Sequence, residues 1–513
     1  MEFAQELQVR LQSFLGNNPP LTLITCIAAL IIAHTIGTIV YNLYFHPLSA
    51  YPGPRSAACT NLAYWRAAFA GDLVPWIRAA HEQYGETVRL GPNTLSYTHP
   101  QAWKDIYGQQ KRTNPKDTLY YPPHLNGRHA VNALPSDADH ARLRRVFAPA
   151  FSPAALRAQT PQILTPFADL LVRNMRKASK QDLVTLLTCT TMDITSDLTF
   201  GAPLGLLATT DDQTAQYTPW VAAIFGWLKA ADLSRVGIEY PWLGALAKAL
   251  TPPSLQRAAR LHFGEAAARV DERVARGAGE RPDLWGYVLR EQEKGEEEKK
   301  KKGEVMDVED MYANATIFML AGSETSATLL SGLVWLLCRN QEKMEKLCAE
   351  VRGQEGGELD VEALPRMKYL AACIEEALRL YPPLPIGPPR EVHRDGNIIC
   401  GKWVPGKTRV GVAQYTAYHS SLYFKDPEEF IPERWLPGTG YDDDRRDVVQ
   451  PFSYGPRNCI GKTLAYQEMR IILAKILWNF DLKLCPESDG WINQKSYTLW
   501  QKDPLWVDAM PIR

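Results

Sequence analysis

Cys459 stands in the segment FSYGPRNCIG, where residue types that could support a thiolate ligand are concentrated. These residues are Phe452, Gly455, Arg457, Cys459 and Gly461. At about 5% usage per residue type, a chance match to such a set in a chain of this length is on the order of one in ten thousand. A cysteine thiolate would give haem iron an electron-rich axial ligand, which favours cleavage of an O–O bond.

The neighbours of Cys459 each have a physical use at such a site. Gly455 and Gly461 would let the backbone turn tightly where a Cβ would clash. Arg457 can pair with a haem propionate, and Phe452 can cover the sulfur and exclude water. The alternative is a buried structural cysteine, which is the usual state of a free cysteine. The surrounding pattern favours the ligand.

Residues 461–480 predict a helix directly after the cysteine, because Leu464, Ile472 and Ile476 fall on one side of it. The free N–H groups and the dipole at the start of that helix would stabilise a thiolate. The helix therefore supports the same interpretation of Cys459.

A long apolar pattern predicts a central helix that begins after Asp307 and ends near Arg339. Asp307 can cap its start, with Asp310 three residues further on. At 1.5 Å per residue the helix would be about 50 Å long, enough to cross a large domain. Gly322 at its middle costs about 1 kcal/mol relative to Ala, and nearby hydroxyls can bond back to carbonyls. We therefore expect the helix to open locally at this point.

Glu324 and Thr325, in the motif AGSETS, could deliver protons at the middle of this helix. An acid next to an alcohol is a combination that can pass protons to a reacting group. Taken alone, the two residues would describe a solvated glutamate and a mid-helix threonine. Together with the Cys459 segment, they favour a proton relay beside a haem that binds dioxygen.

Glu376 and Arg379, in AACIEEALRLYPPLP, are three residues apart and share one helix face. Pro382 and Pro383 end that helix. An ordinary surface pair of this spacing is worth only a few tenths of a kcal/mol. Such a surface pair is the alternative to a buried one.

In their order along the chain, these segments resemble the motifs of the cytochrome P450 monooxygenases. The resemblance runs from about residue 43 to the C-terminus. It implies that Cys459 is the axial ligand of haem b, and that Ala321 and Gly322 face the haem. It further implies that Glu324 and Thr325 guide protons to bound oxygen.

Three further residues match family positions that bind haem propionates. His140 and Arg144, in DADHARLRRVFAPAFS, are one helical turn apart and point the same way. The alternative for that stretch alone is a basic amphipathic helix. Arg390, in PIGPPREV, matches another propionate position.

The resemblance gives the glutamate–arginine pair a structural role rather than a catalytic one. Arg434, in FIPERW, would complete a network with Glu376 and Arg379. One carboxylate between two guanidiniums makes a buried, bidentate arrangement. That network would fix the segment that leads to Cys459.

Composition agrees with the fold that the resemblance implies. The chain has 513 residues, 45% hydrophobic and 22% charged, with a formal net charge of zero. It can bury a large core, and the family packs such a length into one mainly α fold with a small β region. Neutrality gives no reason to expect nucleic-acid binding. Nine scattered cysteines argue against a disulfide framework and for a reducing compartment.

The run from Leu21 to Tyr41 contains no Asp, Glu, Lys or Arg and is long enough to span a bilayer. A buried core helix is the alternative, but the run is apolar on every side. Prolines then make a stiff connector. We divide the chain into a tail (1–20), a transmembrane anchor (21–41), a proline-rich connector (42–56) and a catalytic domain (57–513). Microsomal members of the family look like this, which implies a single pass through the endoplasmic reticulum membrane and a cytosolic catalytic domain.

The segment EQEKGEEEKKKKGE, residues 291–304, is nearly all charge. We expect a solvated loop before the central helix. A docking site for a partner is the alternative.

Family position also assigns the lining of a substrate pocket. Its residues are Tyr120, Tyr121, His124, Ile317, Phe318, Leu384, Ile386, Tyr497 and Leu499. A lining that is apolar with a few hydroxyls suits a medium-sized hydrophobic molecule. The connector and residues 281–291 resemble fungal members that work in secondary metabolism, so we expect a polyketide, terpenoid or alkaloid.

The resemblance implies a monomeric monooxygenase that uses dioxygen and electrons from NADPH. NADPH-cytochrome P450 reductase would supply them, with cytochrome b5 as an optional second donor. Two other classes stay open: an oxygen-independent haem-thiolate isomerase or dehydratase, and a non-catalytic haem sensor. The intact AGSETS motif argues against both, because neither has much use for a proton relay.

Overall fold

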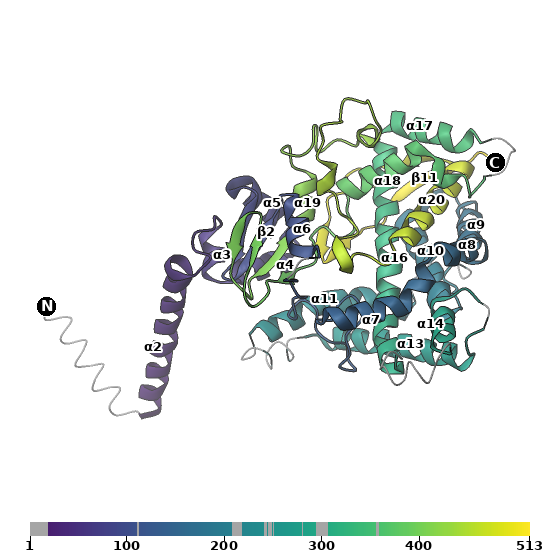
Figure 1. The fold of residues 1–513 in the computed structure, drawn as a ribbon. Helices are drawn as coiled ribbons and strands as arrows, with labels where there is room; N and C mark the ends of the chain where they lie inside the picture. Colours follow the sequence, from purple (N-terminus) through teal and green to yellow (C-terminus); the bar gives the residue numbers. More distant parts are fainter. Residues whose placement is uncertain are drawn as a thin grey trace.

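The charge-free N-terminal run forms helix α2 (Pro19–Val40), and helical backbone continues through Tyr41–Phe45. The segment Leu23–Phe45 has the length and hydropathy of a membrane span, and none of its apolar window is buried. Figure 1 shows α2 projecting away from the body of the protein. An apolar helix that the protein leaves uncovered requires another apolar environment. This arrangement fits the predicted anchor.

The computed structural model describes residues 19–109, 112–207, 218–240, 244, 249, 251–279, 281–293, 306–354 and 359–513. The predicted tail before residue 19 and most of the charged segment 291–304 lie outside the described residues.

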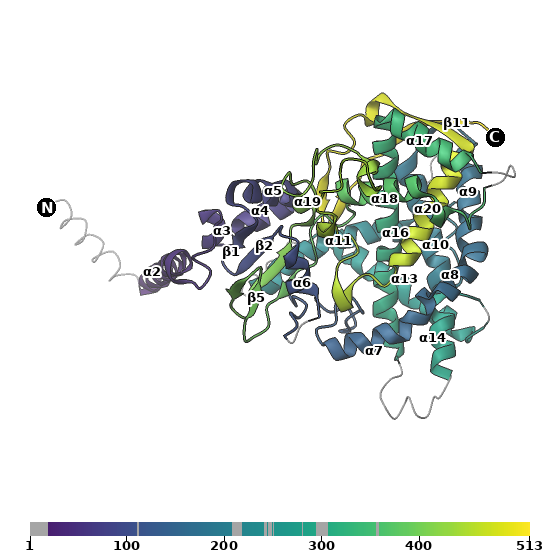
Figure 2. The same ribbon diagram turned by 45° about the horizontal axis from the view of Figure 1, so that its top comes forward.

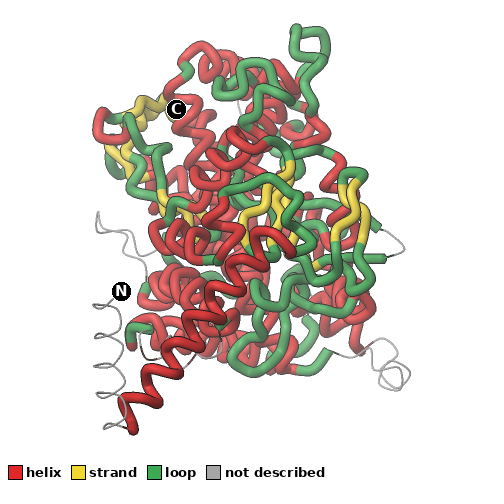
Figure 3. The backbone as a smooth tube through the Cα atoms, turned by 90° about the vertical axis from the view of Figure 1, so that its left-hand side faces the viewer, coloured by secondary structure: helices red, strands yellow, loops and turns green. Residues whose placement is uncertain are grey.

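Helices make up most of the body, which confirms the predicted fold class (Figure 3). The longer ones are α5 (Leu73–Tyr84), α7 (Asp137–Phe147), α9 (Thr165–Met175), α10 (Leu183–Phe200), α11 (Pro219–Glu239), α13 (Pro253–Ala275), α14 (Leu284–Glu293), α16 (Val308–Arg339), α17 (Gln341–Arg352), α18 (Lys368–Leu380) and α20 (Lys462–Asn479). The shorter ones are α3 (Arg55–Cys59), α4 (Leu62–Ala70), α6 (Gln101–Tyr107), α8 (Pro153–Gln159) and α19 (Gln414–Tyr418).

Strands form four small sheets among the described residues. The largest has the order β1 (Thr87–Gly91), β2 (Thr94–Tyr97), β7 (Arg409–Val412), β4 (Arg390–Glu391), and a second has the order β3 (Lys180–Asp182), β11 (Trp506–Pro511), β8 (Phe480–Leu484). Two hairpins complete the set: β5 (Asn397–Ile399) with β6 (Lys402–Val404), and β9 (Lys495–Tyr497) with β10 (Leu499–Gln501). Figure 2 shows the four-stranded sheet between α2 and the helical body.

Helix α16 runs through the middle of the helical body (Figure 1). It begins where the sequence predicts, because the Asp307 side chain accepts a hydrogen bond from the Asp310 amide. The expected local opening at Gly322 is absent, since the backbone stays α-helical from Val308 to Arg339. A Cβ at Gly322 would lie 2.8 Å from Thr195 of α10. The glycine therefore permits the close approach of two helices.

Two hydrophobic clusters meet along α16. Residues 311–320 contribute to the first cluster, which also holds Phe147 and Trp285. From Ala327 onward the helix contributes to the second cluster, together with the apolar faces of α18 and α20. The turn that carries AGSETS lies between the two clusters. Packing therefore leaves the middle of α16 available for a site.

Candidate functional site

The segment around Cys459 forms a tight loop that leads into α20. The Cys459 amide donates to the Phe452 carbonyl at 2.9 Å, which closes the loop. Gly455 has φ +75°, and a Cβ there would lie 2.1 Å from the Tyr107 carbonyl oxygen. Glycine is thus required at residue 455 by both conformation and close approach. Phe452 packs its ring against Tyr466, with centroids 5.1 Å apart.

Gly461 does not meet the same constraint. Its φ of −85° is accessible to any residue. The nearest atoms to an added Cβ would be Phe151 Cε1 at 3.8 Å and Cys459 Sγ at 3.9 Å, which are ordinary contacts. The clash expected from the sequence is therefore absent within the protein itself. Among the described residues, nothing requires glycine at position 461.

The Cys459 side chain is surrounded by protein atoms and yet stays accessible to solvent. An opening therefore lies over the sulfur. Burial raises the pKa of this thiol, while a hydrogen bond from the Gly461 amide and the charges of Arg144 and Lys462 oppose that rise. The amide and the cations would favour the thiolate once a metal ion competes for the proton.

Basic side chains gather beside this loop with little negative charge to balance them. Arg390 of β4 and Lys116 are joined by a backbone bridge, and both are buried. Burial lowers the pKa of Lys116 well below its usual value, and the charges of Arg390 and Arg457 lower it further. The buried Arg390 Nε has no hydrogen-bond partner among the described residues. A ring that carries two carboxylates would neutralise this cluster, so the residues fit haem propionates.

His140 and Arg457 border the same cluster. His140 of α7 is buried, and burial followed by the charges of Arg457, Arg144 and Lys116 lowers its pKa to about 4. Arg457 is paired with Asp137 at 2.6 Å. Lys116 carries no motif in the sequence and was not predicted as a site residue. It becomes visible only when the fold places it against β4.

Ala321 and Thr325 lie one turn apart on α16 and face an opening. Ala321 is exposed and Thr325 is half-buried, although most of the residues around them on the helix are buried. The Thr325 hydroxyl donates to the Ala321 carbonyl at 2.7 Å. Ile317 and Phe318 on the same helix belong to the cluster that includes Ile460, the neighbour of Cys459. The structure thus brings the middle of α16 and the cysteine loop to one region.

The side chains of Glu324 and Thr325 contact different partners. Its side chain is 2% exposed and forms an ion pair with Lys502, whose side chain is 3% exposed. Lys502 also donates to the Thr328 hydroxyl at 2.7 Å. The second carboxylate oxygen, Oε2, has no hydrogen-bond partner among the described residues. The predicted acid is therefore buried and charge-paired next to the predicted alcohol.

A second acid contacts this part of α16 from α20. Ser326 Oγ donates to Glu468 Oε2 at 2.6 Å. Burial raises the pKa of Glu468 to about 8, which the hydrogen bond from Ser326 only partly opposes. Glu468 was not predicted as a site residue. Leu464, Ile472 and Ile476 belong to a series that repeats every four residues, and Glu468 occupies the remaining position of that series. An acid in an otherwise apolar helix face is the sequence signal that could have identified it.

Glu376, Arg379 and Arg434 form a buried network, and all three side chains are fully buried. Glu376 Oε1 accepts from Arg379 at 2.7 Å and from Arg434 at 2.9 Å. Trp435 Nε1 donates to the other carboxylate oxygen at 2.9 Å. Arg434 also pairs with Asp444. The network joins α18 to the segment that precedes the cysteine loop and offers no group to a substrate.

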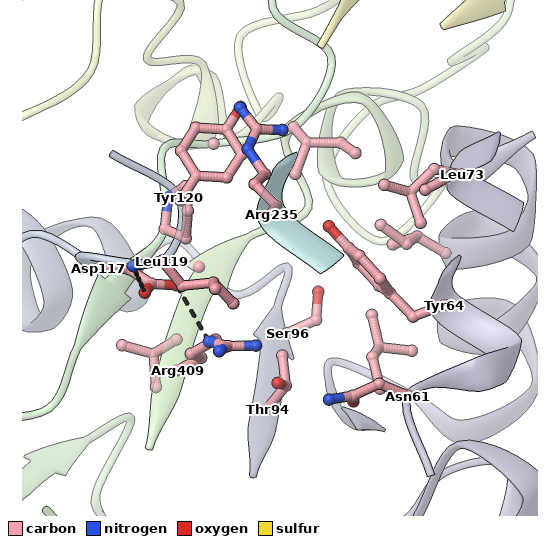
Figure 4. A pocket seen from close by; sticks show the side chains of 18 of the residues that line it. Asn61, Tyr64, Leu73, Thr94, Ser96, Asp117, Leu119, Tyr120, Arg235 and Arg409 are labelled. Carbon is pink, nitrogen blue, oxygen red and sulfur yellow. Dashed lines mark hydrogen bonds and ion pairs between the residues drawn. The ribbon is translucent and has the colours of Figure 1, made fainter. Parts of the chain in front are cut away.

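Six of the nine residues expected to line a substrate pocket fall into two sets, and Tyr121, His124 and Tyr497 belong to neither. Ile317, Phe318, Leu384 and Leu499 share one cluster with Ile460. Tyr120 and Ile386 line a cavity among α4, α5, β2, β7 and the end of α11 (Figure 4).

In that cavity Arg409 pairs with Asp117 at 3.1 Å and with Glu239 at 3.2 Å. Arg235 stacks on Tyr120, with Cζ 3.9 Å from the ring centroid. The remaining lining is largely apolar.

Comparison with known proteins assigns the chain to a family. The sequence profile described as Cytochrome P450 matches residues 52–506. The chain is 44% identical to cytochrome P450 monooxygenase FUM2 of Gibberella moniliformis, over 91% of this chain and 98% of the relative. It is 44% identical to cytochrome P450 monooxygenase AMT3 of Alternaria alternata, over 92% and 95%. It is 39% identical to averantin hydroxylase of Dothistroma septosporum, over 96% and 91%.

Proposed function

This chain belongs to the cytochrome P450 family of haem-thiolate monooxygenases, and we propose that it oxidises a medium-sized hydrophobic metabolite in a fungal biosynthetic pathway. The observation that carries the proposal is the exposure of Cys459 and of Ala321 on α16 beside one hydrophobic cluster, to which their neighbours Ile460 and Leu320 both contribute. Relatives named as cytochrome P450 monooxygenases, and another named averantin hydroxylase, support the reaction class. A polyketide, terpenoid or alkaloid scaffold suits the apolar lining.

Cys459 would ligate the iron of haem b, and the basic cluster would hold its propionates. His140, Lys116 and Arg390 are the buried groups that fit its propionates. Arg144 and Arg457 would reinforce that charge. When bound, the haem supplies activation of dioxygen with electrons from NADPH.

The chain's own residues supply shape, water exclusion and protons. Phe452 and Tyr466 pack together beside the cysteine loop, and we assign to them the exclusion of water from that side of the loop. Thr325 presents a hydroxyl at the opening, and Glu324 lies one residue before it with an oxygen that has no partner among the described residues. We assign proton delivery to this pair, since a positioned donor contributes about 10²–10⁴-fold to such steps.

The position of the anchor supports delivery of substrate from the membrane. The cavity of Figure 4 lies among α4, α5 and the four-stranded sheet, on the side of the body from which α2 projects (Figure 1). A hydrophobic substrate concentrates in lipid, so this side is where it would arrive. We place the protein as a single-pass monomer in the endoplasmic reticulum membrane. NADPH-cytochrome P450 reductase, with cytochrome b5 as an optional donor, would serve it from the cytosol.

The test is to express the full chain beside the enzymes encoded next to it and to analyse the products. Reconstituted with the reductase, the protein should consume NADPH and dioxygen and release a product that carries oxygen or has lost hydrogen. A substrate converted without NADPH or dioxygen would instead indicate an isomerase or dehydratase. Binding of haem and substrate with no conversion at all would indicate a sensor.

A further inference from the structure

We propose that Lys502 is a positioning residue that supplies protons to Glu324 and so sustains the relay at Thr325. The proposal rests on the monooxygenase function proposed above and deepens it. Nothing in the motif AGSETS points to a partner nearly two hundred residues away in sequence. The partner is visible only in the folded chain.

The contact between the two side chains is direct and buried. Lys502 Nζ donates to Glu324 Oε1, and both side chains are at least 97% buried. The same ammonium donates to Thr328 Oγ1 at 2.7 Å, and that hydroxyl lies 3.4 Å from Glu324 Oε1. The lysine thus holds one carboxylate oxygen from two directions and leaves Oε2 without a partner among the described residues.

The hairpin that ends one residue before Lys502 is fixed against the core. Trp500 of β10 stacks on Tyr381, with ring centroids 5.4 Å apart and planes at 16°. Its indole N–H donates to the Pro382 carbonyl at 2.8 Å. On either side of Lys502, Gln501 and Asp503 are exposed. The lysine stem therefore runs inward from a surface turn, and its ammonium lies one side-chain length below solvent.

Stability alone is a weak explanation for such a pair. Removing two charges from water costs about as much as their attraction returns, so apolar replacements of buried pairs are often neutral or stabilising. This pair lies next to Thr325, in the turn between the two hydrophobic clusters. A lysine at that place can carry protons, because its ammonium contacts the buried acid and its neighbours in the chain are exposed to solvent.

The proton balance gives Lys502 a defined step. Insertion of one oxygen atom into a substrate consumes one dioxygen, two electrons and two protons, and releases one water. A proton moves from Lys502 Nζ to Glu324 Oε1, and from Glu324 onward to the Thr325 hydroxyl and the opening. A water bound at the unpartnered Oε2 would complete the last transfer, since buried waters occupy sites where polar atoms lack partners. Lys502 then regains a proton from solvent at the surface turn.

The first experiment measures hydrogen peroxide released per NADPH consumed in the full-length protein with NADPH-cytochrome P450 reductase, without added substrate. We expect Lys502→Met to slow formation of water by about 10²–10⁴-fold, so that nearly all electrons appear in peroxide. Lys502→Arg keeps the positive charge but should not restore the wild-type ratio, because a guanidinium does not release its proton; full restoration by Arg would overturn the proton transfer. Lys495→Met is the matched control, because Lys495 lies on the hairpin that ends next to Lys502 and its side chain is 54% exposed. A ratio for Lys502→Met equal to that of Lys495→Met would overturn the proposal.

A second experiment distinguishes a relay from a structural pair by setting thermal stability beside the peroxide ratio. Thermal midpoints are compared for Lys502→Met, Glu324→Gln and the double variant. Each single change should lower the midpoint, and the double variant should recover part of the loss, because no buried charge is left alone. The double variant should still release its electrons as peroxide. Recovery of both midpoint and wild-type peroxide ratio would make the pair structural and overturn the relay.

The proposed function can fail separately from this inference. If the wild type shows a thiolate-type carbon monoxide spectrum but consumes no NADPH with the reductase, the monooxygenase function fails. If the wild type consumes NADPH and the Lys502 variants match it, only the relay fails.

Discussion

Arg144 of α7 donates to two oxygens of Asn458, to its carbonyl at 2.6 Å and to its side-chain Oδ1 at 2.7 Å. Asn458 is the residue directly before Cys459. Two hydrogen bonds therefore hold the loop against helix α7, next to the proposed ligand. The family position implies a propionate contact for Arg144, and the structure adds this hold on the loop.

Arg144→Met should reduce the amount of haem bound per protein chain. The change removes two charge-assisted hydrogen bonds, each worth about 1.5–3 kcal/mol, and leaves Asn458 without its donors. The ratio of haem to protein absorbance in purified samples measures the effect. Arg145→Met is the control, because Arg145 is exposed on the same helix. Equal haem occupancy in both variants would show that the hydrogen bonds from Arg144 to Asn458 are not needed for haem binding.

Glu376→Ala should give little folded, haem-loaded protein. Arg379 and Arg434 are fully buried and would lose their shared carboxylate, at a cost of roughly 3–5 kcal/mol. Yield of haem-loaded protein and the thermal midpoint measure this loss. Glu342→Ala, at an 86% exposed side chain, serves as the control. Abundant haem-loaded but inactive Glu376→Ala would contradict a structural role and assign the network to chemistry.

Glu468 should make the protein less stable as pH rises. Its pKa is about 8 in the folded chain and 4.5 as the reference value. Between these values the folded state binds more protons than the unfolded state, so the free energy of unfolding falls with increasing pH. One pKa unit corresponds to about 1.4 kcal/mol. The thermal midpoint of wild type should therefore decline across this window.

Glu468→Gln keeps an acceptor for Ser326 and removes the titration. Its thermal midpoint should fall less than that of wild type between these pH values and should exceed it at the alkaline end. Parallel pH curves for the two proteins would mean that Glu468 is ionised throughout.

The sequence predicts those parts of the site that depend on local patterns. Cys459, its glycine at 455 and the long helix through AGSETS are each readable from spacing, conformation or periodicity. The start of α16 at Asp307 is also local, because a cap needs only its own first turn.

Other features depend on contacts between distant segments. Lys116 reaches Arg390 through a backbone bridge, and Lys502 reaches Glu324 across the body. From the sequence alone, Gly322 predicts a local opening of the helix. In the structure, a glycine is needed there because Thr195 of α10 lies too close for a Cβ. Propensity and spacing cannot locate these contacts, because tertiary packing decides them.

Thr325→Ala should separate electron consumption from product formation. It removes the hydroxyl that donates to the Ala321 carbonyl and leaves the loop at Cys459 untouched. NADPH consumption should continue while product per NADPH falls and hydrogen peroxide rises. Thr325→Ser, which keeps the hydroxyl, should stay close to wild type. An unchanged yield in Thr325→Ala would remove Thr325 from the relay.

The absorption spectrum of the reduced protein with carbon monoxide tests most directly whether Cys459 is the thiolate ligand of the haem. The geometry around Cys459 predicts a band at the position of thiolate-ligated haem in the wild type. Cys459→Ala should lose that band, whereas Cys59→Ser, at a half-buried cysteine of α3, should keep it. A normal thiolate band in Cys459→Ala would contradict the account, because another cysteine would then be the ligand.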